Sequence, residues 1–297
     1  MKKSYLGIFA IACLLLINSN YASANSKRAW KIMEDDLIAN IIKSIPSPIE
    51  ITVLMKESGV LYNKELLNDH NKSGEYATNF DKALNLGIYS TDLGFANIYG
   101  NTQDAIHYLN AVQDLAEGLV IDQFFEYKVL KDMASSNNLD QLIQTTTRNF
   151  EKINDHLHEQ QRDVISALLL TGGWIESTYL TTVVYSKGKN DMVKAALKEK
   201  IGEQKFVMER LMLLLDIYST KPRVPQLVTE LQKLQNIYDE IEIETINTGD
   251  TKVIVDPETG KIRFEEPDGN EQVIKISDSQ IQQISSIVKS IRSQIIQ

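Results

Sequence analysis

The sequence predicts an all-α protein, a helical bundle or an irregular helical stack with a small β-hairpin near the C-terminus. Three observations support this fold class. Residues 49–221 contain no proline, which favours helices over loops and turns. In several segments the apolar residues recur at alternating steps of four and three, as on one face of a helix. A short stretch before the last helical segment instead has the composition of two strands joined by a turn.

The first 24 residues have the features of a secretory signal peptide. Two lysines precede an apolar run at residues 5–17, and Ala22-Ser23-Ala24 matches the small-x-small pattern that signal peptidase recognises. We expect cleavage after Ala24 and export to the periplasm or cell envelope. In the alternative interpretation, Cys13 is the processing site of a lipoprotein and carries a lipid anchor. Cys13 is the only cysteine, so cleavage after Ala24 would leave a mature chain without a thiol.

Predicted helices then follow one another along the chain. They cover residues 30–42, 47–59, 80–99, 102–118, 122–134, 139–157, 163–185, 190–219, 225–241 and 281–295, with one short helical turn at 64–67. The Ser47-Pro48-Ile49-Glu50 start combines an N-cap serine with proline at the first helical position. Gly59, Gly100, Gly118 and Gly188 are the expected helix stops, and Asp163 is an expected N-cap.

The three C-terminal helices carry regular heptad-like stripes of leucine, isoleucine and valine. Such stripes predict long helices packed at shallow angles, either in a bundle core or in a coiled coil. We therefore consider a homo-oligomer formed through the C-terminal helices. Gln204 falls within one stripe, where it either sets the register as a buried amide or lies at an exposed edge.

The chain divides into three predicted parts: the signal peptide at 1–24, a helical domain at 25–221, and a C-terminal antiparallel helix pair at 222–297 packed on that domain. The pair is interrupted by a β-hairpin at about 251–276. Residues 252–255 and 261–264 are the expected strands, joined by the turn Asp256-Pro257-Glu258-Thr259-Gly260, and residues 272–276 are a candidate third strand.

Composition excludes several classes of protein. The net charge of −9 argues against nucleic-acid binding, which requires a basic surface. The chain has no apolar run of 18 residues, so we do not expect an integral membrane protein. His156 and His158 lie two residues apart and therefore point away from one another on a helix, so we predict no metal site and no cofactor.

Glycine pairs suggest a close helix crossing. Gly172 and Gly173 lie inside an apolar helical pattern, where each costs about 1 kcal/mol relative to alanine. A close approach to a second helix bearing Gly87 or Gly94 would offset that cost. The alternative is a kink or a small cavity that admits a ligand.

Two carboxylates are candidates for a functional site. Asp92 has Tyr89 one turn before it, and Glu176 has Tyr179 at the equivalent spacing after it. If the two helices touch, these four residues would line a polar pocket, and paired carboxylates can perform general acid/base chemistry. In the competing interpretation, each carboxylate hydrogen-bonds to neighbouring groups or faces solvent.

Three motifs resemble a group of uncharacterised exported helical proteins of Bacteroidetes-type bacteria. They are the Ser47-Pro48-Ile49-Glu50 start, Leu84-Asn85-Leu86-Gly87-Ile88-Tyr89 and Thr171-Gly172-Gly173-Trp174. The resemblance spans most of the mature chain. It implies export and an α-helical fold, and it assigns no functional residue.

The sequence contains no Gly-x-Ser-x-Gly elbow, phosphate loop or HExxH motif. We therefore expect a non-enzymatic scaffold or binding protein of the bacterial cell envelope with a protein partner there. The alternative is a small-molecule-binding protein, or a hydrolase, with a pocket around Asp92 and Glu176.

Overall fold

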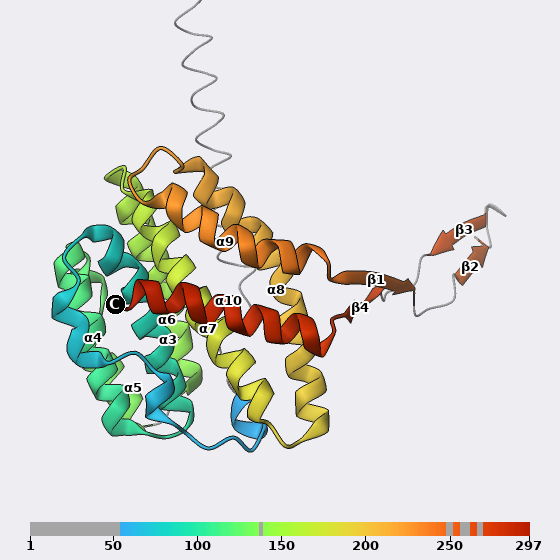
Figure 1. The fold of residues 1–297 in the computed structure, drawn as a ribbon, viewed down its shortest axis with the longest axis horizontal. Helices are drawn as coiled ribbons and strands as arrows, with labels where there is room; N and C mark the ends of the chain where they lie inside the picture. The colour runs from blue at the N-terminus through green and yellow to red at the C-terminus, as the bar shows by residue number, and fades with distance from the viewer. Residues whose placement is uncertain (1–53, 137–138, 248–251, 256–261, 266–269) are drawn as a thin grey trace, which may run out of the picture. The chain divides into compact units, whose positions relative to one another are not determined.

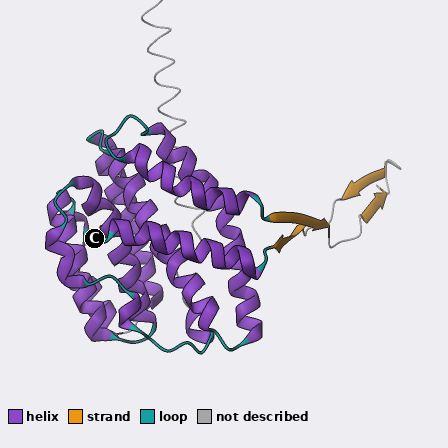
Figure 2. Ribbon diagram, in the orientation of Figure 1, coloured by secondary structure: helices purple, strands orange, loops and turns teal. Residues whose placement is uncertain are grey.

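A computed structural model describes residues 54–136, 139–247, 252–255, 262–265 and 270–297, and these residues form a helical stack with a small antiparallel β excursion near the C-terminus (Figure 1, Figure 2). The predicted fold class is confirmed. The signal peptide with Cys13 and Ala24, the predicted helix at 30–42 and the Ser47 helix start lie outside the described residues. Residues 54–57 are helical, and Gly59 follows with φ 74°, as expected of a helix stop.

The α-helices occur in the predicted order. Their bounds are Asn79–Ile98 (α3), Thr102–Leu119 (α4), Tyr127–Ser136 (α5), Leu139–Glu159 (α6), Asp163–Lys187 (α7), Asp191–Ile217 (α8), Val224–Asp239 (α9) and Asp278–Ile295 (α10). Short 3-10 helices lie at Lys64–Leu66 (η1), His70–Glu75 (η2) and Asp122–Phe124 (η3). The predicted turn at residues 64–67 corresponds to η1.

Local capping explains several helix ends. Thr78 accepts a hydrogen bond from the Asp81 N–H at the start of α3, and Ser277 forms a capping box with Gln280 at the start of α10. Gly100 follows α3 with φ 70°, a conformation that costs glycine little because it lacks a Cβ.

Helix α7 contacts α3, α6, α8 and α10, and most of its residues are buried. Several of its buried hydroxyls bond within the helix. The Thr171 hydroxyl donates to the Ala167 carbonyl at 2.7 Å, and the Thr181 hydroxyl donates to the Ser177 carbonyl at 2.6 Å. α7 therefore positions side chains for contacts with four neighbouring helices.

The apolar stripes of the C-terminal helices face the interior of the chain itself. Their buried members are Leu197, Ile201, Met208, Leu211 and Leu215 in α8, Leu227, Leu231, Leu234 and Tyr238 in α9, and Ile281, Ile284, Val288 and Ile291 in α10. Gln204 is 6% exposed and accepts a hydrogen bond from the Trp174 indole N–H at 2.9 Å. Gln204 is thus a buried amide that links α8 to α7.

Three helix predictions are wrong in detail. Gly118 does not end its helix, because α4 continues to Leu119 and Val120 adopts the left-handed conformation with φ 59°. The Ile121 N–H donates to the Ala116 carbonyl, and the buried Ile121 side chain fixes this later end.

The predicted helix at 122–134 is instead two elements, η3 and α5, because Phe125 takes an extended conformation between them. Asp163 is also not an N-cap: Arg162 occupies that position. Asp163 is the first residue of α7, and its Oδ1 lies 2.5 Å from His158 Nδ1 of α6.

The β excursion contains two antiparallel ladders. Strand β2 (Lys252–Val255) pairs with β3 (Ile262–Glu265), and β1 (Glu242–Asn247) pairs with β4 (Asn270–Lys275). The sequence analysis anticipated β2, β3 and β4 and missed β1. The turn predicted at 256–260 lies outside the described residues. Ile274 of β4 packs against Gly202 of α8, so the base of the excursion rests on the helices.

Candidate functional site: a buried charged cluster

The crossing of α3 and α7 brings two helix backbones into contact. A Cβ added at Gly87 would lie 2.1 Å from the Leu169 carbonyl oxygen, and one added at Gly172 would lie 2.0 Å from the Leu84 carbonyl oxygen. Neither position has room for a side chain, so both helices need glycine there. The structure therefore places Gly87 and Gly172 where a close helix crossing requires them.

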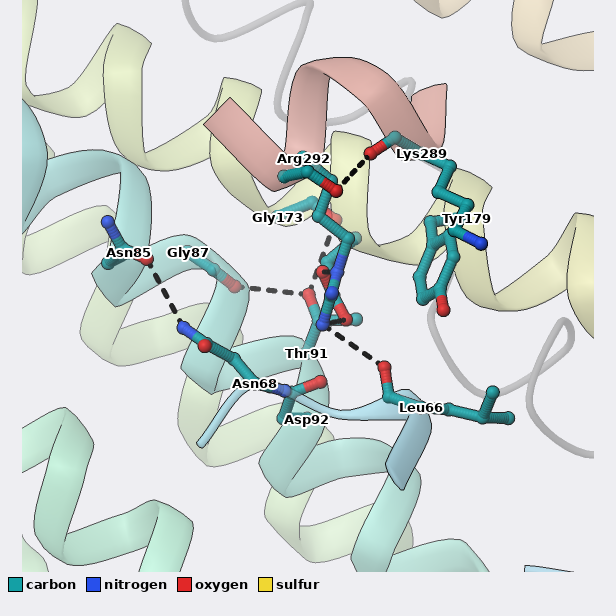
Figure 3. A network of polar contacts seen from close by, with 12 residues as sticks. Leu66, Asn68, Asn85, Gly87, Thr91, Asp92, Gly173, Tyr179, Lys289 and Arg292 are labelled. Carbon is teal, nitrogen blue, oxygen red and sulfur yellow. Dashed lines mark hydrogen bonds and ion pairs between the residues drawn. The ribbon is translucent and has the colours of Figure 1, made fainter. Parts of the chain in front are cut away.

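The other two candidate glycines differ from one another. A Cβ at Gly173 would lie 3.5 Å from the Gly87 carbonyl oxygen, an ordinary contact distance, and Gly94 has nothing within 4 Å. The Thr91 hydroxyl lies between the helices, 3.1 Å from the Gly87 oxygen and 3.3 Å from the Gly173 oxygen (Figure 3). Gly173 is thus part of the crossing, whereas Gly94 is outside it.

Asp92 of α3 and Glu176 of α7 lie at this crossing, and each is 0% exposed. Arg292 of α10 enters the same space and is 7% exposed. Its Nε donates to Glu176 Oε2, and its second guanidinium nitrogen donates to Glu176 Oε1 at 2.9 Å, which makes the pair bidentate. Despite the opposing effect of burial, Glu176 raises the pKa of the Arg292 guanidinium.

Arg292 also holds two further groups. Its guanidinium donates to the Leu66 carbonyl oxygen at 3.1 Å, and it lies 4.5 Å from the centre of the Tyr179 ring (Figure 3). Through one side chain, α10 is therefore connected to α7 and to the segment that includes η1.

Asp92 lies at the α3 side of the cluster and is fully buried. Its Oδ2 accepts a hydrogen bond from the Asn68 backbone N–H at 3.0 Å, whereas its Oδ1 has no N–H donor. Burial, and then the negative charge of Glu176, raise the pKa of Asp92 well above its ordinary value. We therefore infer that Asp92 carries a proton, which would leave Asp92, Glu176 and Arg292 together without net charge.

Tyr89 and Tyr179, the other two candidate site residues, have different positions. Tyr179 stacks on Arg292, and burial raises the pKa of its hydroxyl. The Tyr89 hydroxyl donates to the Asp69 backbone carbonyl at 2.7 Å, and its ring lies 6.2 Å from that of Tyr108. Asp92, Glu176 and Tyr179 therefore converge on Arg292, while Tyr89 supports the backbone beside them.

Arg292, Asn68 and Asn85 also belong to the site, and the sequence did not predict them as site residues. The Asn68 side-chain amide donates to Asn85 Oδ1 at 3.3 Å and to the Tyr76 hydroxyl at 3.0 Å. Asn85 in turn donates to the Ile295 carbonyl oxygen at 3.1 Å, near the end of α10. The available signal was the position of Arg292 beside the apolar stripe of the last helix, where an arginine at the edge of a core needs a partner.

The cluster has the composition of an acid/base site and the connectivity of a structural one. Arg292 and Glu176 bond to one another, and Arg292, Asp92 and Tyr89 each bond to the backbone of residues 66–69. Within the described residues, His, Asp, Glu and Cys side chains form no group of three suited to holding a metal ion. No helix among those residues has both the length and the hydropathy of a membrane span.

A comparison of the chain with protein-family models, curated proteins and solved structures gave no match. The resemblance to exported helical proteins of Bacteroidetes-type bacteria therefore stays a prediction from the sequence.

Proposed function

We propose that this chain is an exported, non-enzymatic helical protein that serves as a scaffold or binding module of the bacterial cell envelope. The observation that carries the proposal is the buried Glu176–Arg292 pair. The side chains best suited to chemistry are engaged in joining helices. Export is supported by the signal-like N-terminus ending at Ala24.

Burial argues against catalysis at the carboxylates. A substrate must reach the reacting group, and Asp92 and Glu176 are 0% exposed. A molecule approaching Glu176 along α10 would have to displace Arg292 and leave a buried charge unpaired, which costs several kcal/mol. Such a cost is acceptable for a conformational change, but not for a site that must admit substrate in every catalytic cycle.

A small-molecule-binding protein, or a hydrolase, with a pocket at Asp92 and Glu176 is the alternative. The raised pKa of Asp92 favours it, because perturbed carboxyls are common at functional sites. The Asp92→Asn and Glu176→Gln variants distinguish the two functions. A structural role predicts a change in stability only, whereas a ligand site predicts loss of a ligand-dependent shift in melting temperature.

The partner-binding role is tested in the source bacterium with an affinity-tagged chain and several crosslinkers of different length. We expect a stoichiometric envelope protein to co-purify from envelope fractions. A matched sample of the Gly94→Ala variant, altered at an unoccupied position, should recover the same protein. Absence of any stoichiometric partner with every crosslinker would contradict a scaffold role.

Intact-mass measurement of the exported chain tests its processing. Cleavage after Ala24 leaves Asn25 as the first residue, whereas a diacylglyceryl mass on Cys13 would replace soluble export with a lipid anchor.

A homo-oligomer through the C-terminal helices would use their outer faces, because the apolar stripes of α9 and α10 are already buried. Light scattering of the purified mature chain measures that state directly.

A further inference from the structure

A groove opens at the surface where α7 and α10 run together, and Asp92, Glu176 and Arg292 take no part in it. Its volume is about 390 Å³, within the range of small-molecule sites. Thr182 and Ile281 are buried and form its floor, whereas Ser186, Gln282 and Ser286 are exposed at its rim. The groove therefore combines a rigid base built on two helices with access from solvent.

Most lining residues carry hydrogen-bonding side chains, set in a lining surface that is more apolar than polar. Besides the two lysines and one aspartate discussed below, the polar lining residues are Thr182, Tyr185, Ser186, Gln282, Ser285 and Ser286. Hydroxyl and amide groups both donate and accept hydrogen bonds, but the Thr182, Tyr185 and Ser186 hydroxyls already donate within the chain and offer a ligand only an acceptor. A lining of this kind complements a ligand that itself carries many hydroxyl groups.

The groove is positively charged in an acidic chain. Lys194 and Lys289 line it, and within the described residues neither has an ion-pair partner. The one carboxylate in the lining, Asp278, already accepts hydrogen bonds from Lys198 at 2.6 Å and from the Tyr185 hydroxyl at 2.9 Å. Those two bonds, and more weakly the charge of Lys194, lower the pKa of Asp278. The charge of Lys289 is therefore left for a ligand, whereas that of Lys194 is shared between a ligand and Asp278.

The two lysines lie toward opposite ends of the groove. Lys194 sits 5.0 Å from the centre of the Tyr185 ring, beside Asp278 at the start of α10. Lys289 is eleven residues further along α10, which corresponds to roughly 16 Å of helix. A ligand that reaches both ammonium groups is therefore elongated, longer than a single sugar ring.

From this geometry we infer that the groove binds a short acidic saccharide, with carboxylate or phosphate groups at Lys194 and Lys289 and sugar hydroxyls at the serine, threonine and glutamine side chains. Tyr185 completes the site as an acceptor and as a ring surface, because burial and Asp278 raise its pKa to about 12 and its one hydroxyl proton is donated to Asp278. This site goes beyond the proposed scaffold role and does not depend on it.

The test is calorimetric titration of the mature chain with trigalacturonate as the carboxylate probe. Neutral maltotriose and inorganic phosphate are titrated beside it. We expect trigalacturonate to bind, maltotriose not to bind, and phosphate to bind at least tenfold more weakly. Phosphorylated maltotriose in place of trigalacturonate distinguishes phosphate from carboxylate as the acidic group.

Lys194→Gln and Lys289→Gln should each weaken trigalacturonate binding about tenfold or more, the usual contribution of a charge-assisted hydrogen bond. Lys128→Gln, on the exposed surface of α5, is the matched control and should leave binding unchanged. Thermal melts confirm that each variant is folded. No binding by either acidic trisaccharide, equal binding of phosphate, or equal loss with Lys128→Gln would overturn the inference.

Discussion

Replacing Asp92 by Asn tests the assignment of a proton to this buried carboxyl. The amide keeps the shape of the side chain and can donate to Glu176 while its oxygen accepts from the Asn68 N–H. The variant therefore reproduces the hydrogen bonds of protonated Asp92 without a titratable group. Its stability relative to the wild type should depend on pH with a definite sign.

The magnitude follows from proton linkage. The pKa of Asp92 is raised in the folded protein above its ordinary value of 3.8, so above pH 3.8 the folded chain binds a proton that the unfolded chain has lost. Wild-type stability then falls as pH rises, by about 1.4 kcal/mol for each pH unit, until the pH reaches the folded pKa. The Asp92→Asn variant does not lose stability in this way. Its free energy of unfolding relative to the wild type should therefore increase by about 2.7 kcal/mol over two pH units while Asp92 stays protonated in the wild type.

Urea unfolding of both chains at pH 4.5, 5.5 and 6.5 measures this difference, and the pH at which it stops growing is the folded pKa. Asp278→Asn is the matched control. The pKa of Asp278 is lowered in the folded state, so above pH 3.8 its carboxylate is ionised in both states and its effect should be constant. An Asp92→Asn difference that is flat across the range, or that shrinks as pH rises, would refute a protonated Asp92.

Three further predictions concern the same cluster and crossing, and each is measured as a free energy of unfolding. Arg292→Met should destabilise the chain by about 3–5 kcal/mol, because it leaves Glu176 charged and buried; adding Glu176→Gln should recover most of that loss. Full additivity of the two changes would contradict this. Gly172→Ala and Gly87→Ala should each cost at least about 1–3 kcal/mol, because the new methyl meets a backbone oxygen of the facing helix. Gly94→Ala should be neutral or stabilising by up to about 1 kcal/mol, because alanine has the higher helix propensity and nothing lies near the new methyl; a loss like that at Gly172 would show that the close crossing does not explain these values.

The helices were predictable from the sequence because their signals are local. Capping residues such as Ser277 and the regular spacing of Ile281, Ile284 and Val288 act within a few turns of one helix. The incorrect predictions concern features that depend on tertiary packing rather than on local sequence. The end of α4 moved past Gly118 because Ile121 is buried, and β1 was missed because its pairing partner β4 lies more than twenty residues away.

Of the candidate site, only Asp92 and Glu176 could be predicted to lie together from the sequence. Helical neighbours placed Asp92 and Glu176 on partly apolar faces, and the glycines at 87 and 172 indicated which helices meet. Nothing local to residues 89–179 indicates that the partner of Glu176 comes from residue 292. That contact exists because α10 packs on α7, which is a property of the whole fold.

The buried Glu176–Arg292 pair also fixes the axial position of α10, which the apolar stripe of that helix defines only weakly. Isoleucines and valine spaced at three and four residues pack almost equally well when a helix shifts by one turn, so apolar contacts alone define the axial position of α10 weakly. A shift of one turn moves Arg292 about 5.4 Å, out of reach of Glu176 and Leu66, and leaves two charges and a carbonyl buried without partners. The cluster therefore selects one register of the last helix against α7, and that specificity is the property a scaffold requires of a surface it presents to a partner.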